Sequence, residues 1–125
     1  FLENIMKILL VEDSHDFRHK MKELLEDLDH QILEAGDGIE GYDLIKNHSD
    51  IDLIISDLHM PNMDGLSMCK KLKDEAFETA PIMMVTTEAN PQLRKDGMEA
   101  GVSIWMIKPV SDKKFLTMVE KILNR

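Results

Sequence analysis

Residues 53–65 read LIISDLHMPNMDG, a short apolar run that ends at an aspartate and continues into a loop containing proline, asparagine and glycine. Apolar runs of about four to eight residues, bounded by turn-forming residues, are typical of strands buried on both faces. Similar runs recur along the chain, and the full set occupies residues 8–11, 32–35, 53–56, 82–85 and 104–107. The pattern predicts five buried strands.

The segments between these runs show the spacing of amphipathic helices. After the first run, apolar residues recur on one helical face at Phe17, Met21, Leu24, Leu25 and Leu28. Ser14 is placed to cap this helix, and Ser111 is placed to cap the last one. Asp37 lies three residues before Glu40, which predicts a reciprocal cap for the second helix. The third helix is expected to follow Asp64-Gly65.

The segment 90–101 has the weakest helical pattern. Pro91 suits only the first turn of a helix, and Gly97 costs about 1 kcal/mol relative to alanine inside one. We therefore expect the fourth helix to be mobile.

Alternation of strands with helices favours a parallel sheet, because parallel neighbours need a helical crossover between them. The sequence thus predicts an α/β fold, a doubly wound five-stranded parallel sheet with helices on both faces. A chain of 125 residues suits one domain, which we place at 6–125. Residues 1–5 are interpreted as an N-terminal extension or a remnant of cloning, with Met6 as a candidate start.

The composition argues against several kinds of partner. The chain has 15 basic and 24 acidic residues, and its formal net charge of −9 disfavours direct binding to nucleic acid or to an anionic membrane. Cys69 is the single cysteine, and no apolar run approaches the roughly 20 residues of a membrane span. Since the N-terminus lacks the pattern of a signal peptide, we expect a cytoplasmic protein.

Polar residues follow the predicted strands at the points where the strands end. Glu12-Asp13 follow the first strand, Asp57 the third, Thr86 the fourth and Lys108-Pro109 the fifth. Ligands of open parallel sheets bind beyond the carboxyl ends of the strands, so these side chains should meet. Crowded carboxylates need a cation, and oxygen ligands suit Mg²⁺, which is completed by phosphate oxygens. A metal site that handles a phosphoryl group is the hypothesis that follows.

This ordered set, together with Met60-Pro61 and Asp64-Gly65 after Asp57, resembles the pattern of receiver domains of two-component response regulators. The resemblance covers nearly the whole chain and is closest to the single-domain, chemotaxis-regulator-like members. It implies a flavodoxin-like strand order of 2-1-3-4-5. It also implies a signalling switch rather than an enzyme in the usual sense, although such domains catalyse their own phosphorylation and dephosphorylation.

The resemblance further implies a role for each site residue. Asp57 would be the phosphoacceptor, forming an aspartyl phosphate with a phosphoryl group from a kinase phosphohistidine. Asp13, Asp57 and the backbone carbonyl of His59 would ligate Mg²⁺, or Mn²⁺ as an alternative, with Glu12 acting through metal-bound water. Lys108 would neutralise the phosphoryl oxygens.

Further roles concern the switch and the phosphorylation lifetime. Thr86 corresponds to the hydroxyl that moves toward the phosphoryl group, and Trp105 to an aromatic residue that turns inward as space is vacated. The changed surface would comprise the fourth helix, fifth strand and fifth helix. His59 and Glu88 would set the phosphorylation lifetime, and the Lys108-Pro109 bond would be cis.

The expected partners are a sensor histidine kinase or phosphotransfer protein and a downstream protein target, with the chain a monomer or a weak phosphorylation-dependent dimer. The main alternative is a pseudo-receiver, a protein-binding module with slow or no phosphorylation, because Thr87 is bulkier than the residue common after the switch hydroxyl. A phosphohydrolase would carry an acid where His59 stands. A flavodoxin-like cofactor binder would need a hydroxyl- or glycine-rich loop in place of Glu12-Asp13.

Overall fold

The computed structural model describes residues 5–123, so most of the predicted extension at 1–5 lies outside the described residues. Five strands alternate with five helices in this part of the chain. In order they are β1 Lys7–Val11, α1 His15–Glu26, β2 Gln31–Ala35, α2 Gly38–Asn47, β3 Leu53–Ser56, α3 Gly65–Asp74, β4 Ile82–Thr86, α4 Pro91–Glu99, β5 Val102–Ile107 and α5 Asp112–Ile122. All five predicted strands are present, and β5 begins two residues early because polar Ser103 interrupts its apolar pattern.

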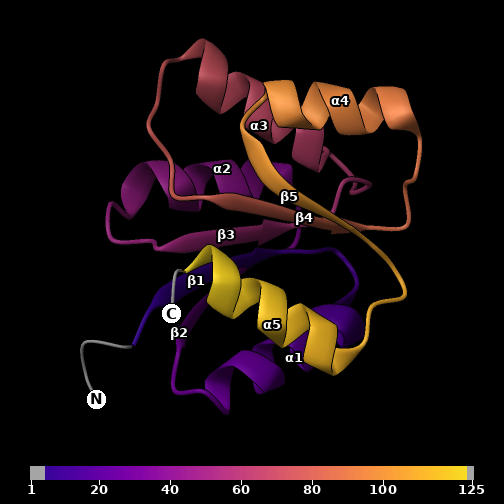
Figure 1. Ribbon diagram of the computed structural model, residues 1–125. Coiled ribbons are helices and arrows are strands. Elements are labelled where there is room, and N and C mark those ends of the chain that lie inside the picture. The colour runs from indigo at the N-terminus through magenta and orange to yellow at the C-terminus, as the bar shows by residue number, and fades with distance from the viewer. Residues whose placement is uncertain (1–4, 124–125) are drawn as a thin grey trace.

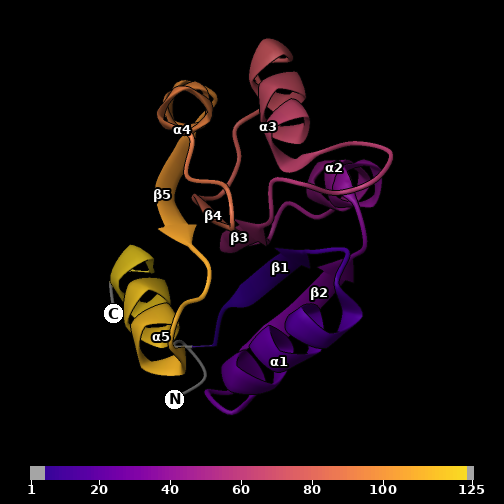
Figure 2. The same ribbon diagram turned by 90° about the vertical axis from the view of Figure 1, so that its right-hand side faces the viewer.

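The strands form one parallel sheet in the order β2-β1-β3-β4-β5. Helices α1 and α5 cover one face, and α2, α3 and α4 cover the other (Figures 1 and 2). The doubly wound α/β fold and its strand order are therefore confirmed. Among residues 5–123, no helix is long and apolar enough to cross a membrane.

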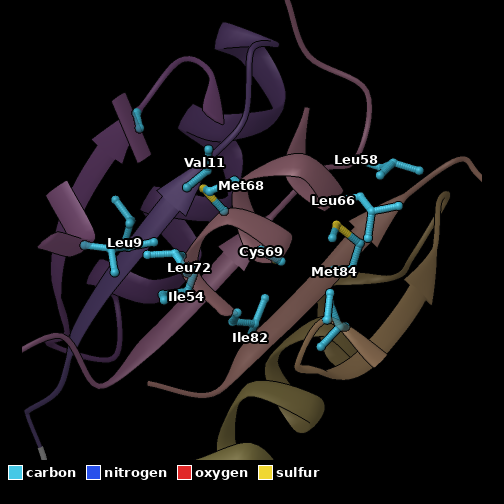
Figure 3. Packing of buried hydrophobic residues seen from close by; sticks show 14 of the residues in the cluster. Leu9, Val11, Ile54, Leu58, Leu66, Met68, Cys69, Leu72, Ile82 and Met84 are labelled. Atoms are coloured by element: carbon cyan, nitrogen blue, oxygen red, sulfur yellow. The ribbon is translucent and has the colours of Figure 1, made fainter. Parts of the chain in front are cut away.

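Alternate residues of each strand supply the two cores. In β1, Ile8 and Leu10 pack with residues of α1 and α5, while Leu9 and Val11 pack with residues of α2 and α3. Figure 3 shows the second of these cores, in which Cys69 lies among the buried apolar side chains. Burying a side chain of leucine size contributes about 1.5 to 3 kcal/mol. Burial also raises the pKa of the Cys69 thiol to about 12, so Cys69 is expected to be an unreactive residue of the core.

Side-chain caps start the helices at the predicted positions. Ser14 Oγ accepts a hydrogen bond from the Phe17 amide, and Ser111 Oγ accepts one from the Lys114 amide. Asp37 caps α2 through the Glu40 amide at 2.9 Å. The Glu40 carboxylate reaches back to the amide of Gly36, just before the cap, so the reciprocal arrangement is present one residue earlier than its usual form.

Helix α4 is shaped by its contact with β5. Asn90 caps the helix, and Pro91 occupies its first turn, where the missing amide costs nothing. A Cβ atom at Gly97 would lie 2.7 Å from Cζ3 of Trp105. The glycine that weakens the helical pattern is thus the residue that lets the indole ring pack against the helix. The mobility expected for α4 stays a prediction.

Gly97→Ala should therefore lower the free energy of unfolding by about 1 to 3 kcal/mol through overpacking, although alanine favours an isolated helix by about 1 kcal/mol. Urea unfolding measures the change. In a Trp105→Leu background, which removes the ring, the same substitution should be neutral or stabilising. An equal loss of stability in both backgrounds would contradict the proposed packing role of Gly97.

Candidate functional site

The carboxyl ends of β1 and β3 carry three acidic side chains. Strands β1 and β3 are neighbours, and the Asp57 amide donates to the Val11 carbonyl at 2.9 Å, which sets the two strand ends side by side. Carboxylate oxygens of Glu12, Asp13 and Asp57 all lie within 4.8 Å of one another. The acidic cluster predicted from the sequence is therefore present, at the edge of the sheet that Figure 2 faces.

The ammonium of Lys108 enters this cluster from the end of β5. Its Nζ lies 2.7 Å from Glu12 Oε1 and 3.2 Å from Asp57 Oδ2. The peptide bond between Lys108 and Pro109 is cis, as predicted. One cation thus bridges two of the three carboxylates.

Burial shifts the pKa values of Glu12 and Lys108. Glu12 is only 1% exposed, and desolvation raises the pKa of its carboxyl by more than the bond to Lys108 lowers it. Burial alone would lower the pKa of Lys108, but its bonds to Glu12 and Asp57 prevail and raise it. Both shifts therefore favour the protonated forms of Glu12 and Lys108. The Ser14 amide completes the surroundings of Glu12, donating to Oε2 at 3.1 Å.

Asp57 is held by its own loop. Its Oδ1 accepts a hydrogen bond of 2.6 Å from the Leu58 amide, and its backbone carbonyl accepts one from the Ser56 hydroxyl. A Cβ atom at Gly65 would lie 2.1 Å from this carbonyl oxygen, while the Gly65 amide donates to the Leu58 carbonyl. The glycine after Asp64 therefore lets α3 start directly against the loop that carries Asp57.

Thr86 and Glu88 lie at the end of β4. Thr86 is fully buried, its carbonyl accepts from the Lys108 amide at 2.8 Å, and its hydroxyl accepts from the Glu88 amide at 3.2 Å. The first bond ties the ends of β4 and β5 together, and the second fixes the start of the loop after β4. Thr87, whose bulk raised the question of hindered access, is exposed beside them.

Glu88 connects three of the predicted residues. Its carboxylate lies 3.0 Å from Nε2 of His59, and this hydrogen bond lowers the pKa of Glu88. Its backbone carbonyl accepts a 3.0 Å bond from the indole N–H of Trp105, which is 7% exposed. The indole of Trp105 therefore lies inside the protein, and the side chains of His59 and Glu88 meet beyond the end of β4.

Comparison with known proteins decides the family. The model of the response regulator receiver domain matches residues 8–120. The chain belongs to this family. The receiver domain is similar to a chemotaxis protein CheY homolog of Campylobacter jejuni, with 37% identity over 95% of this chain and 93% of the relative. It is therefore CheY-like along nearly its whole length.

Solved structures agree with this fold. The chemotaxis protein CheY4 of Vibrio cholerae superposes with a TM-score of 0.85 at 29% identity, covering 94% of this receiver domain and 98% of that chain. The receiver domain of a sensor histidine kinase from Pseudomonas aeruginosa superposes with a TM-score of 0.84 at 23% identity, over 97% and 99% of the two chains. That domain has a magnesium ion coordinated in its active-site cleft.

Two residues of this receiver domain that touch the site were not predicted as site residues. The centroid of the Phe17 ring lies 4.1 Å from Lys108 Nζ, a cation–π contact. Arg18 donates to the Glu12 carbonyl at 2.6 Å and pairs with Glu34, which fixes the β1–α1 loop. In the sequence, Phe17 stood out only as part of the apolar face of α1 and Arg18 did not stand out, because both contacts depend on how that helix packs.

The chemistry of the donor set fits a hard divalent cation. Three carboxylates converge, and Lys108 supplies only one positive charge to offset them. Asp13 is exposed, so its oxygens are open to an ion that keeps several waters, as Mg²⁺ does. The cluster is consistent with the phosphorylation site of a receiver domain.

Lys108→Met should lower the free energy of unfolding by about 2 kcal/mol or more near pH 7 without added metal, because it leaves the buried Glu12 carboxylate without its cation. Since the pKa of folded Glu12 already lies above its unfolded value, the folded state takes up a proton first as pH falls. The loss of stability should therefore shrink toward about pH 5. Urea unfolding at both pH values checks this.

Lys20→Met is the matched control, because Lys20 is exposed and pairs with exposed Asp112. It should cost at most about 1 kcal/mol at either pH. A Lys108→Met loss no larger than that of the control, or one that grows as pH falls, would show that Lys108 does not compensate Glu12.

Proposed function

We propose that this receiver domain, placed at 6–125, is phosphorylated on Asp57 by a sensor histidine kinase or phosphotransfer protein. In this step a carboxylate oxygen of Asp57 forms a bond to phosphorus as the bond between phosphorus and the donor histidine nitrogen breaks. The imidazole leaves with the electron pair and takes up a proton. The observation that best supports this proposal is that the Asp57 carboxylate lies 3.2 Å from the Lys108 ammonium, inside an acidic cluster.

The residues around Asp57 supply charge and position. Lys108 neutralises phosphoryl oxygens, and the Thr86 hydroxyl becomes their hydrogen-bond donor once it turns from Glu88. Asp13, Asp57 and the carbonyl of His59 would hold Mg²⁺, or Mn²⁺, with Glu12 acting through water. When bound, the ion supplies positive charge to the phosphoryl oxygens. The magnesium ion in the receiver domain from Pseudomonas aeruginosa supports this choice of cation.

The switch acts on the surface formed by α4, β5 and α5. A phosphoryl group adds a charge of about −1.5 to −2 and new acceptor oxygens, which draw Thr86 toward Asp57. The Thr86 hydroxyl accepts a hydrogen bond from the Glu88 amide, and the Glu88 carbonyl accepts one from the Trp105 indole. A movement of Thr86 would therefore displace Trp105. Exposed Met98 of α4 and Ile107 of β5 offer a downstream protein an apolar contact on this surface.

The His59–Glu88 pair is proposed to set the phosphorylation lifetime. The two side chains meet at 3.0 Å, with His59 on the loop of Asp57 and Glu88 after Thr86. In this position they restrict the path of a water molecule to the phosphoryl group. Replacing both residues should therefore change the dephosphorylation rate, which intact-protein mass spectrometry follows after phosphorylation by a small phosphodonor.

Incubation with Mg²⁺ and a small acyl or amido phosphate should add the mass of one phosphoryl group to the protein. Asp57→Asn should abolish the addition, because the amide is no nucleophile, and a chelator should suppress it. Intact-protein mass spectrometry measures both effects. Asp50→Asn is the matched control, because exposed Asp50 lies before β3, whereas Asp57 follows it. This variant should be phosphorylated like the wild type.

No mass increase under forcing concentrations of donor would favour the pseudo-receiver, a protein-binding module that keeps the fold without the chemistry. A mass increase retained in Asp57→Asn would place the acceptor elsewhere. Either result would overturn the proposal.

A further inference from the structure

Two exposed histidines lie one turn apart on α1, which is not one of the elements α4, β5 and α5 of the proposed switch surface. The imidazole rings of His15 and His19 are stacked, with centroids 6.1 Å apart and planes within 4°. Their side chains are 79% and 59% exposed. We propose that His15 and His19 form a binding site for one divalent transition-metal ion of the Zn²⁺ class, separate from the acidic cluster.

The four-residue spacing of His15 and His19 suits a shared metal ion. Residues four apart in a helix project from the same face, and two histidines at this spacing are a recurrent pair of zinc ligands. Both rings are mostly exposed, and the χ2 torsion of histidine has a broad energy profile. A rotation of each stacked ring can therefore direct one nitrogen at a shared ion.

Two carboxylates lie near ring nitrogens of His15 and His19. Glu23 Oε1 lies 2.6 Å from His19 Nε2, and Asp16 Oδ1 lies 3.7 Å from His15 Nδ1. Histidine ligands of metals usually present the second ring nitrogen to a carboxylate, which orients the ring and makes the ligating nitrogen more basic. The ion pair with Glu23 leaves Nδ1 of His19 for the ion, and His15 keeps its Nε2.

Ligand type separates this site from the acidic cluster. Imidazole nitrogen suits Zn²⁺, Cu²⁺ and Ni²⁺, whereas the carboxylates of Glu12, Asp13 and Asp57 suit Mg²⁺. The remaining positions around the ion would be filled by water. The chain's net charge of −9 favours the approach of any divalent cation, so the nitrogen pair supplies the selectivity.

Binding at this pair would act on the start of α1. An ion held by two residues one turn apart binds the helical conformation more tightly than the unfolded chain, so it stabilises that turn by mass action. His15 is the first residue of α1 and follows Asp13 by two positions. The site would thus couple transition-metal binding to the order of the segment that leads out of the acidic cluster.

Calorimetric titration with ZnCl₂, in buffer containing excess MgCl₂, tests the site. The wild type should bind one Zn²⁺ per chain. His15→Gln and His19→Gln should each weaken binding by at least about tenfold, because each removes a ligand. Glu23→Gln should weaken it by roughly tenfold, the lower end of the effect of outer carboxylates.

His48→Gln is the matched control, because His48 lies at the end of α2 with its Nδ1 3.0 Å from the Leu44 carbonyl. It should bind Zn²⁺ as the wild type does, and His59→Gln should do the same. Equal Zn²⁺ affinity in the wild type and in His15→Gln/His19→Gln would overturn the proposal. So would loss of Zn²⁺ binding on Asp13→Asn with both histidines intact, which would assign the ion to the acidic cluster.

Phosphorylation of the double histidine variant distinguishes the Zn²⁺ site from the site at Asp57. His15→Gln/His19→Gln should still gain one phosphoryl group from a small donor, because neither histidine touches Asp57 or Lys108. Loss of Zn²⁺ binding with phosphorylation retained supports the site even if the kinase partner is wrongly assigned.

Discussion

The ammonium of Lys108, lying between the carboxylates of Glu12 and Asp57, is the interaction on which the rest of the site depends. Three carboxylates whose oxygens lie within 4.8 Å repel one another, and burial makes the charge of Glu12 still more costly. One lysine offsets part of this repulsion and leaves a net negative site. Such a site retains an attraction for a divalent cation, which would offset the negative charge of an incoming phosphoryl group.

The sheet topology is what makes this arrangement possible. Glu12 and Lys108 are 96 residues apart in sequence, yet both follow parallel strands whose carboxyl ends lie at one edge. The same edge carries Thr86, so the group that would sense a phosphoryl is tied to β5 by the bond between the Lys108 amide and the Thr86 carbonyl. In the proposed switch, a phosphoryl group on Asp57 would act on Trp105 through Thr86 and Glu88, which are joined by hydrogen bonds.

Much of this could be predicted from the sequence, because the signals are local. Short apolar runs gave the strands, and Ser14, Asp37 and Ser111 gave the helix starts. The acidic cluster followed from a general rule on strand ends.

What could not be predicted depends on packing between distant elements. Nothing near Phe17 in the sequence indicates that its ring contacts Lys108, and Glu88 meets Trp105 only once α4 is in place. Gly97 illustrates the difference. Its sequence signal was a weak helix, whereas its contact with Trp105 shows why the position favours glycine. The roles assigned to the site residues by family resemblance remain proposals.

Calorimetry with MgCl₂ at neutral pH tests the central claim most directly, because it probes the electrostatics of the cluster without a kinase or phosphodonor. The account predicts that one Mg²⁺ binds per chain at millimolar concentrations, and that Asp13→Asn, which removes an exposed carboxylate of the cluster, greatly weakens binding. Absence of binding in the wild type, or unchanged binding in Asp13→Asn, would contradict it.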